Sequence, residues 1–278
     1  MNCDSLQIYR GFDIGTAKTP LPARGNIPHH LFDVLRAGDG YSAGEYAQAA
    51  RAVIKEIAGR QALPVVVGGT GFYLRALLEG LPALPERDTD LRARLMRRQT
   101  AGPGSLHRIL RRFDPAAAGR IHVQDVQKTL RALEICLLTR TGLPEKTTAS
   151  RLEGFSFVKI GLAPERVALA KRLEQRTRKM FENGLIEEVR AMLAGGATGD
   201  EKPFESLGYK QTLRLVRGQS TRAEAVESTI VETRQYAKRQ LTWFRRDAEI
   251  RWLHGFGDDE IAMAEAAALV RASLRYST

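Results

Sequence analysis

The chain has 278 residues, 43% hydrophobic and 27% charged, which is sufficient for the core of a globular domain. It contains no apolar run near the roughly 20 residues that a membrane-spanning helix needs and no signal-peptide pattern. Its two cysteines argue against a disulfide framework or a Cys-rich zinc site, so we expect a reducing cytoplasm, and its net charge of +11 indicates a polyanionic partner.

The first eighteen residues gather polar side chains. Asp4 and Ser5 stand where a strand would be ending, and Gln7 follows within a turn-rich stretch that runs to Pro22. An acceptor, a hydroxyl and an amide this close together suit a functional site better than a core. Considered alone, Asp4 could also be a turn or helix-capping residue.

Residues 24–81 predict a loop, a helix, a strand and a second helix. His29 and His30 are adjacent and would point to opposite sides of an extended chain, so we expect a structural or ligand-lining role and no shared metal. Ser42 and Glu45 form a capping box for a helix over 42–59. Val65 to Val67 predict a strand buried on both faces. A glycine turn, GGTG, then leads into a helix over 72–81, a geometry that could cradle phosphate or be a plain tight turn.

Residues 82–138 predict basic helices. Asp88 and Asp125 are expected N-caps, and a Gly-Pro-Gly break over 102–104 separates two helices between them. One group of arginines falls here and a second basic group falls in the long helix near the end of the chain. Each group could contact phosphate or form a solvated helix face. The first group comprises Arg92, Arg94, Arg97, Arg98, Arg108, Arg111 and Arg112.

Residues 155–278 predict a strand, several helices and a last strand. A strand over 155–162 precedes a helix beginning at Pro164, in which Arg172 and Arg176 share one face. Short helices over 184–220 precede one long helix from Arg222. There, Trp243 could stack on a base or belong to the core. A strand over 250–254 and an Ala-rich helix close the chain.

Five separated motifs resemble the tRNA dimethylallyltransferase (tRNA isopentenyltransferase, IPP transferase) family. Residues 4–7, 9–11 and 13–18 match, in order, its D-S-x-Q-x-Y-[RK]-G-x-D-I-G-T-A-K motif. Further matches are G-G-T at 68–70, residues 125–134 with Lys128 in place of an arginine, L-G-Y-K at 207–210, and T-R-x-x-A-K-R-Q-x-T-W-F-R at 233–245. Lysine keeps the charge at 128 but loses the bidentate fork.

The resemblance implies an activity, a fold and site residues. The activity is transfer of a dimethylallyl group from dimethylallyl diphosphate to N6 of adenosine 37, beside the anticodon of tRNA. Asp4 would be the general base, assisted by Thr70, with Mg²⁺ as cofactor and no metal ligands within this chain. Arg172 and Arg176 are candidates for the diphosphate, or alternatively a surface pair near Glu174 and Glu182. The implied contacts to the tRNA anticodon stem-loop are Asp4, Ser5, Leu6, Gln7, Thr70, Arg92, Gln127, Lys128, Thr129, Leu130, Arg131, Gly208, Tyr209, Lys210, Lys238, Arg239, Gln240 and Arg245.

The implied fold is α/β, a parallel-sheet core of the P-loop kinase type with helical insertions. We expect the core in residues 1–81, 120–182 and 224–278, the insertions in 82–119 and 183–223, and a monomer. The family's first strand and P-loop have no counterpart here, because no G-x-x-x-x-G-K-[ST] occurs. We therefore expect this chain to be weakly active or inactive. Two alternatives remain open: a tRNA-binding chain without catalysis, and a small-molecule phosphotransferase of the same fold.

Overall fold

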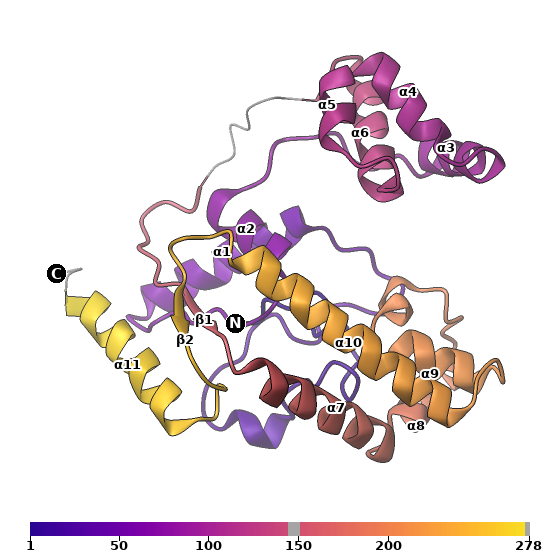
Figure 1. Cartoon of the computed structure of the whole chain (residues 1–278). Helices are drawn as coiled ribbons and strands as arrows, with labels where there is room; N and C mark the ends of the chain where they lie inside the picture. The colour runs from indigo at the N-terminus through magenta and orange to yellow at the C-terminus, as the bar shows by residue number, and fades with distance from the viewer. Residues whose placement is uncertain (144–150, 276–278) are drawn as a thin grey trace. The chain divides into compact units, whose positions relative to one another are not determined.

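The computed structural model describes residues 1–143 and 151–275, which divide into two compact units (Figure 1). Unit 1 comprises Met1–Leu78 and Arg151–Thr278, and unit 2 comprises Glu79–Ser150. In chain order the elements are η1 (Leu21–Arg24), α1 (Ala43–Gly59), α2 (Gly71–Glu79), α3 (Thr89–Ala101), α4 (Ser105–Phe113), α5 (Pro115–Arg120), α6 (Val126–Thr139), β1 (Ile160–Leu162), α7 (Arg166–Glu182), α8 (Leu185–Ala194), η2 (Lys202–Glu205), α9 (Tyr209–Val216), α10 (Arg222–Phe244), β2 (Arg251–Leu253) and α11 (Glu260–Arg275).

The strand pairings of unit 1 are parallel. β1 pairs with β2 in the register Ile160 to Arg251 and Leu162 to Leu253, although the two strands are separated along the chain by α7–α10. A single parallel bridge joins Asn2 to Val67. Parallel pairing across long helical connections is the pattern of an α/β core.

The expectation that Val65 to Val67 form a strand buried on both faces is wrong. The segment is extended, but Val65 is 56% exposed and Val67 is 66% exposed. The Val67 N–H donates to Met1 O at 3.0 Å, and Val67 O accepts from the Cys3 N–H at 2.8 Å. Among the described residues this is the segment's only ladder partner, so its other edge and its valines stay accessible.

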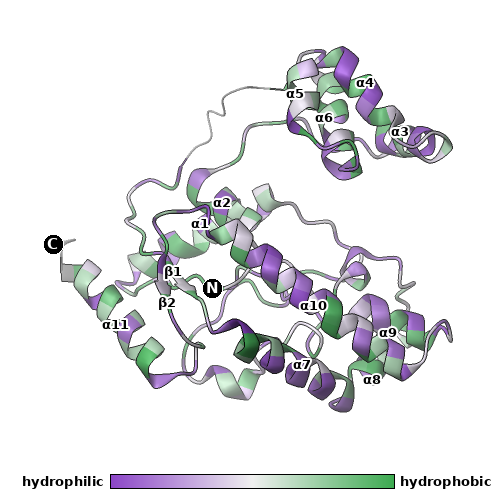
Figure 2. Cartoon of the chain, in the orientation of Figure 1, coloured by the Kyte–Doolittle hydropathy of each residue, from purple (hydrophilic) through white to green (hydrophobic). Residues whose placement is uncertain are grey.

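The core of unit 1 lies where the first loops meet the helices α7–α10 (Figure 1). Phe12, Leu185 and Tyr209 are fully buried there, and the rings of Phe12 and Tyr209 lie 4.8 Å apart. Figure 2 shows hydrophilic and hydrophobic residues mixed along α7 and α10, as expected for helices that pack on one side only. The predicted capping box of Ser42 and Glu45 is confirmed at the start of α1.

Unit 2 is a small helical bundle. Its core includes Leu106 and Leu110 of α4 with Leu130 and Leu133 of α6. Asp88 and Asp125 cap α3 and α6 as expected. The division into units differs from the sequence-based boundaries in two places. α6, which the sequence assigned to the core, packs on α4, because its apolar face meets leucines of the insertion. α8 and α9, which the sequence assigned to an insertion, pack into the core of unit 1.

Candidate active site

Asp4 lies in a turn that fixes its carboxylate. Its Oδ1 accepts the backbone N–H of Leu6 at 2.8 Å and of Gln7 at 3.3 Å, and its own N–H donates to Asn2 Oδ1 at 2.9 Å. Among the described residues nothing donates to Oδ2. Asp4 is therefore both a turn residue and a partly exposed carboxylate with one oxygen left to accept a proton.

Thr70 adjoins Asp4 through Ser5. Its Oγ1 accepts Ser5 N–H at 3.1 Å and lies 3.4 Å from Ser5 Oγ. The Thr70 N–H donates to Cys3 O at 3.2 Å, which ties the turn before α2 to the first residues of the chain. The structure thus brings Asp4, Ser5 and Thr70 together at one place in unit 1.

The glycine turn is explained by close packing. A Cβ on Gly69 would lie 2.3 Å from Gln240 Nε2, and one on Gly71 would lie 2.2 Å from Trp243 Nε1. Gln240 Nε2 donates to Gly69 O at 2.9 Å. Both glycines therefore let α10 approach the start of α2, and the tight-turn interpretation accounts for them without a bound phosphate. Trp243 is 40% exposed and packs against the turn.

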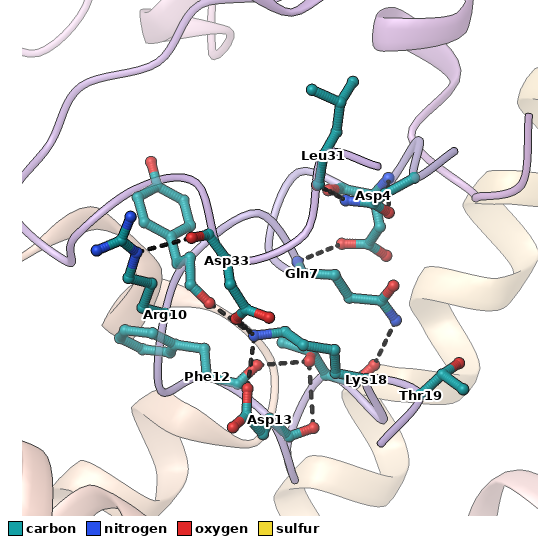
Figure 3. Close-up of polar contacts among 12 residues, drawn as sticks. Asp4, Gln7, Arg10, Phe12, Asp13, Lys18, Thr19, Leu31 and Asp33 are labelled. Atoms are coloured by element: carbon teal, nitrogen blue, oxygen red, sulfur yellow. Dashed lines mark hydrogen bonds and ion pairs between the residues drawn. The ribbon is translucent and has the colours of Figure 1, made fainter. Parts of the chain in front are cut away.

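Gln7 links Asp4 to the loop of residues 13–18. Its backbone N–H donates to Asp4 Oδ1, and its side-chain Nε2 donates to Thr16 O at 3.1 Å (Figure 3). Lys18 anchors the end of this loop: its Nζ donates to Tyr9 O, Asp13 Oδ1 and Asp33 Oδ1 at 2.5–2.7 Å. No described residue donates to the Gln7 amide oxygen, which is therefore available as an acceptor.

A cavity of about 610 Å³ lies between this loop and α7. The loop contributes one wall and the cationic side of α7 the other. Arg176 has no ion-pair partner among the described residues, and desolvation lowers the pKa of its guanidinium while the charge of Asp4 opposes that change. The lining residues are Asp13, Ile14, Ala17, Lys18, Pro20, Arg172, Gln175, Arg176, Lys179, Met180 and Asn183.

Arg172 also lines the cavity, but its guanidinium is engaged. It donates to both carboxylate oxygens of Asp258, one at 2.8 Å, and lies 4.4 Å from the Phe256 ring centroid. The Asp258 carboxylate raises the pKa of Arg172. Among the described residues, Glu174 forms its ion pairs with Arg178 and Arg234, and not with Arg172 or Arg176. The sequence missed Asp258, since no spacing rule connects the loop after β2 to α7.

Helix α10 carries exposed cations beside this site. Lys238, Arg239 and Arg245 are exposed and form no ion pair with a described residue. Arg234 of the same helix is engaged, because it forms an ion pair with Glu174 at 2.8 Å. Tyr236 is 39% exposed, and burial together with the charge of Asp4 raises the pKa of its hydroxyl.

The LGYK motif is placed inside unit 1. Tyr209 is 0% exposed, Gly208 has a φ of 86° at the N-cap of α9, and Lys210 forms an ion pair with Glu232 at 2.5 Å. A side chain as buried as that of Tyr209 has no surface to offer a tRNA. Its hydroxyl donates to Glu188 Oε1 and accepts from the backbone N–H of Gly15.

The candidate tRNA residues of unit 2 are partly exposed and partly buried. Arg92 and Arg131 donate to Glu134, which is 0% exposed, at 3.1 and 2.6 Å. Gln127 and Lys128 are exposed, whereas Thr129 and Leu130 are 1% and 2% exposed and face the core. Six arginines of α3 and α4 are exposed and unpaired among the described residues: Arg94, Arg97, Arg98, Arg108, Arg111 and Arg112.

Two kinds of feature are absent from the part of the chain that the structure describes: a metal-binding cluster and a membrane-spanning helix. Residues 1–143 and 151–275 hold no group of three or more His, Cys, Asp or Glu side chains that could bind a metal ion. None of the helices in the same residues combines the length and hydrophobicity that crossing a membrane would require. His29 Nδ1 bonds to Ile27 O at 2.8 Å.

The comparisons with known proteins agree on one family. The IPP transferase model matches residues 7–247. A tRNA dimethylallyltransferase of Solibacter usitatus is 53% identical over 260 residues, which cover 93% of this chain and 85% of that protein. One of Koribacter versatilis is 51% identical over 277 residues, covering 98% and 90%.

Solved structures support the same conclusion. The tRNA isopentenylpyrophosphate transferase of Bacillus halodurans superposes with a TM-score of 0.68 at 34% identity, covering all of this chain and 90% of that one. The Staphylococcus epidermidis enzyme gives 0.69 at 29% identity, with the same coverage. These neighbours confirm the expected α/β fold class. The chain belongs to the IPP transferase family.

Proposed function

We propose that this chain transfers a dimethylallyl group from dimethylallyl diphosphate to N6 of adenosine 37 in tRNA. The family and the names of the relatives support the reaction type. The observation that carries the proposal for this chain is an arrangement in unit 1. Asp4, whose Oδ2 has no donor among the described residues, is linked through Gln7 to the loop of residues 13–18, and Arg176 lines the same cavity as that loop.

The two groups suit the two halves of the reaction. An exocyclic adenine amine is a weak nucleophile, so its attack on the donor carbon needs a base for the departing proton. Asp4 Oδ2 would take that proton as the N–C bond forms and the C–O bond to diphosphate breaks. Arg176 would stabilise the negative charge that develops on the leaving pyrophosphate. The adenine must leave the anticodon stack, which costs a few kcal/mol.

The donor would occupy the cavity between α7 and residues 13–18. Arg176 and Lys179 present cations to it, while Arg172 could contribute after exchanging Asp258 for a phosphate oxygen. We propose Mg²⁺ as the cofactor, held by oxygens of the diphosphate.

Exposed cations would hold the RNA. Lys238 and Arg239 of α10 would contact phosphates of the anticodon stem-loop. The six exposed arginines of α3 and α4 are candidates for the same kind of contact. Gln7 would read the adenine edge through its amide oxygen. We further propose that the protein acts as a monomer in the cytoplasm, and the monomer is testable by sedimentation.

The test is an incubation of the chain with a tRNA that carries A36 and A37 and with labelled dimethylallyl diphosphate. Label in the RNA supports the proposal. Binding of tRNA without any label would favour the non-catalytic alternative. Turnover of ATP without RNA would favour the phosphotransferase.

A further inference from the structure

Three successive backbone N–H groups of the loop after Phe12 donate to the half-buried side chain of Glu188 and the buried side chain of Tyr209. Glu188 Oε2 accepts from Asp13 N at 3.2 Å and from Ile14 N at 2.9 Å. The Tyr209 hydroxyl accepts from Gly15 N at 3.1 Å and donates to Glu188 Oε1 at 2.5 Å. A run of N–H groups of this kind makes an anion-binding concavity, and here a carboxylate of the same chain fills it.

The fit is steric as well as polar. A Cβ on Gly15 would lie 2.4 Å from Tyr209 Cε2, so the Tyr209 ring occupies the space that any larger residue at position 15 would need. The ring is fully buried against Phe12 and Phe204 in the core of unit 1. Glu188 and Tyr209 therefore fix the position of the loop backbone at residues 13–15.

This loop connects the two halves of the candidate site. Thr16 O accepts from the Gln7 side chain, and Gln7 N–H donates to Asp4 Oδ1. Asp13, Ile14 and Ala17 of the same loop line the cavity opposite Arg176. A loop displaced from Glu188 would consequently move the Gln7 side-chain amide, which Thr16 O holds, and change the cavity wall.

We propose that Glu188 and Tyr209 are positioning residues that hold residues 13–16 so that Gln7 presents its amide oxygen to the acceptor adenine. The inference rests on the proposed function and gives the LGYK tyrosine a role inside the protein. Neither side chain touches the RNA. A role in stability alone would lower the melting temperature and leave the seating of the base unchanged.

The experiment uses the full chain and an anticodon stem-loop with adenosine at position 37 and 2-aminopurine at position 38, whose fluorescence rises when the neighbouring base leaves the stack. The variants are Tyr209→Phe, which keeps the ring, and Glu188→Gln, which keeps the size. The matched controls are Tyr41→Phe, outside the loop contacts, and Glu187→Gln, an exposed neighbour on α8. Binding affinity is measured separately by gel shift, and amide exchange of residues 13–15 by mass spectrometry.

Both variants should bind the stem-loop as wild type does. Losing one hydrogen bond to a carboxylate should speed amide exchange at 13–15 by about tenfold or more. The fluorescence rise should shrink, since the base is seated less often, and both controls should match wild type.

Two outcomes overturn the inference: amide exchange that matches wild type in both variants, or faster exchange with the full fluorescence rise. If wild-type protein itself gives no fluorescence rise while it binds the stem-loop, the proposed base seating fails. Faster exchange in the variants would then leave Glu188 and Tyr209 as structural residues only. The readouts thus separate the two failures, and none depends on the prenyl donor.

Discussion

Replacing Asp4 by Asn is the sharpest perturbation of the proposed chemistry. The amide oxygen of Asn can accept the N–H groups of Leu6 and Gln7 that Asp4 Oδ1 accepts now, so the turn should persist. Stability should therefore change by no more than about 1 kcal/mol. The amide cannot take a proton from the adenine amine, and this is the only function that the substitution removes.

The expected kinetic cost follows from general-base catalysis. Losing a positioned base lowers a rate by about 10²–10⁴-fold, which corresponds to roughly 3–5 kcal/mol of barrier at 1.36 kcal/mol for each factor of ten. Transfer of labelled dimethylallyl group to tRNA under single-turnover conditions measures it. Affinity for tRNA, measured by gel shift, should stay within about threefold, since a rim contact contributes little.

The control is Asp200→Asn, an exposed carboxylate in unit 1 that is 3.8 Å from Arg217. It should transfer at the wild-type rate. Transfer by Asp4→Asn at a rate close to that of the control would refute the assignment of Asp4 as the base.

Three more predictions follow from the described contacts. Arg176→Met should raise the dissociation constant of inorganic pyrophosphate, measured by calorimetry, by about tenfold or more, because a charge-assisted bond is lost, whereas the exposed Arg190→Met should not. Asp114→Ala should lower the free energy of unfolding by about 1 kcal/mol at pH 7, because the carboxylate caps α5. Backbone N–H donors hold the pKa of Asp114 below its usual 3.8. In urea titrations the loss of stability should therefore be full above pH 3.8 and shrink as the pH falls below it. Gln at both Arg97 and Arg98 should reduce the slope of log affinity for tRNA against log salt by roughly 0.7–0.9 per arginine that contacts phosphate; an unchanged slope would remove α3 from the interface.

Local signals predicted the helices well. Ser42 with Glu45, Asp88 and Asp125 each cap the helix that the sequence assigned to them, because an N-cap is a contact between near neighbours in the chain. The burial of Val65 to Val67 was not predictable in the same way. A run of β-branched residues indicates extended backbone, but how many strands flank it depends on distant segments.

The candidate site shows the same contrast between contacts of near neighbours, which the sequence indicates, and contacts of distant segments, which it does not. Asp4, Ser5 and Gln7 lie together because they are near neighbours in one turn, and Thr70 joins them through the parallel bridge of Asn2 and Val67. The partners of Arg172 and Tyr209 could not be read from the sequence, because Asp258 and Glu188 lie on other elements. Motif membership suggested that Tyr209 contacts tRNA, while its burial indicates an internal role.

The most direct test of the central claim is a structure of the chain bound to an anticodon stem-loop and a non-reactive analogue of dimethylallyl diphosphate. The account predicts that N6 of the unstacked adenine lies about 3 Å from Asp4 Oδ2, with Arg176 on the diphosphate. An adenine seated elsewhere, or a diphosphate out of reach of Arg176, would contradict it.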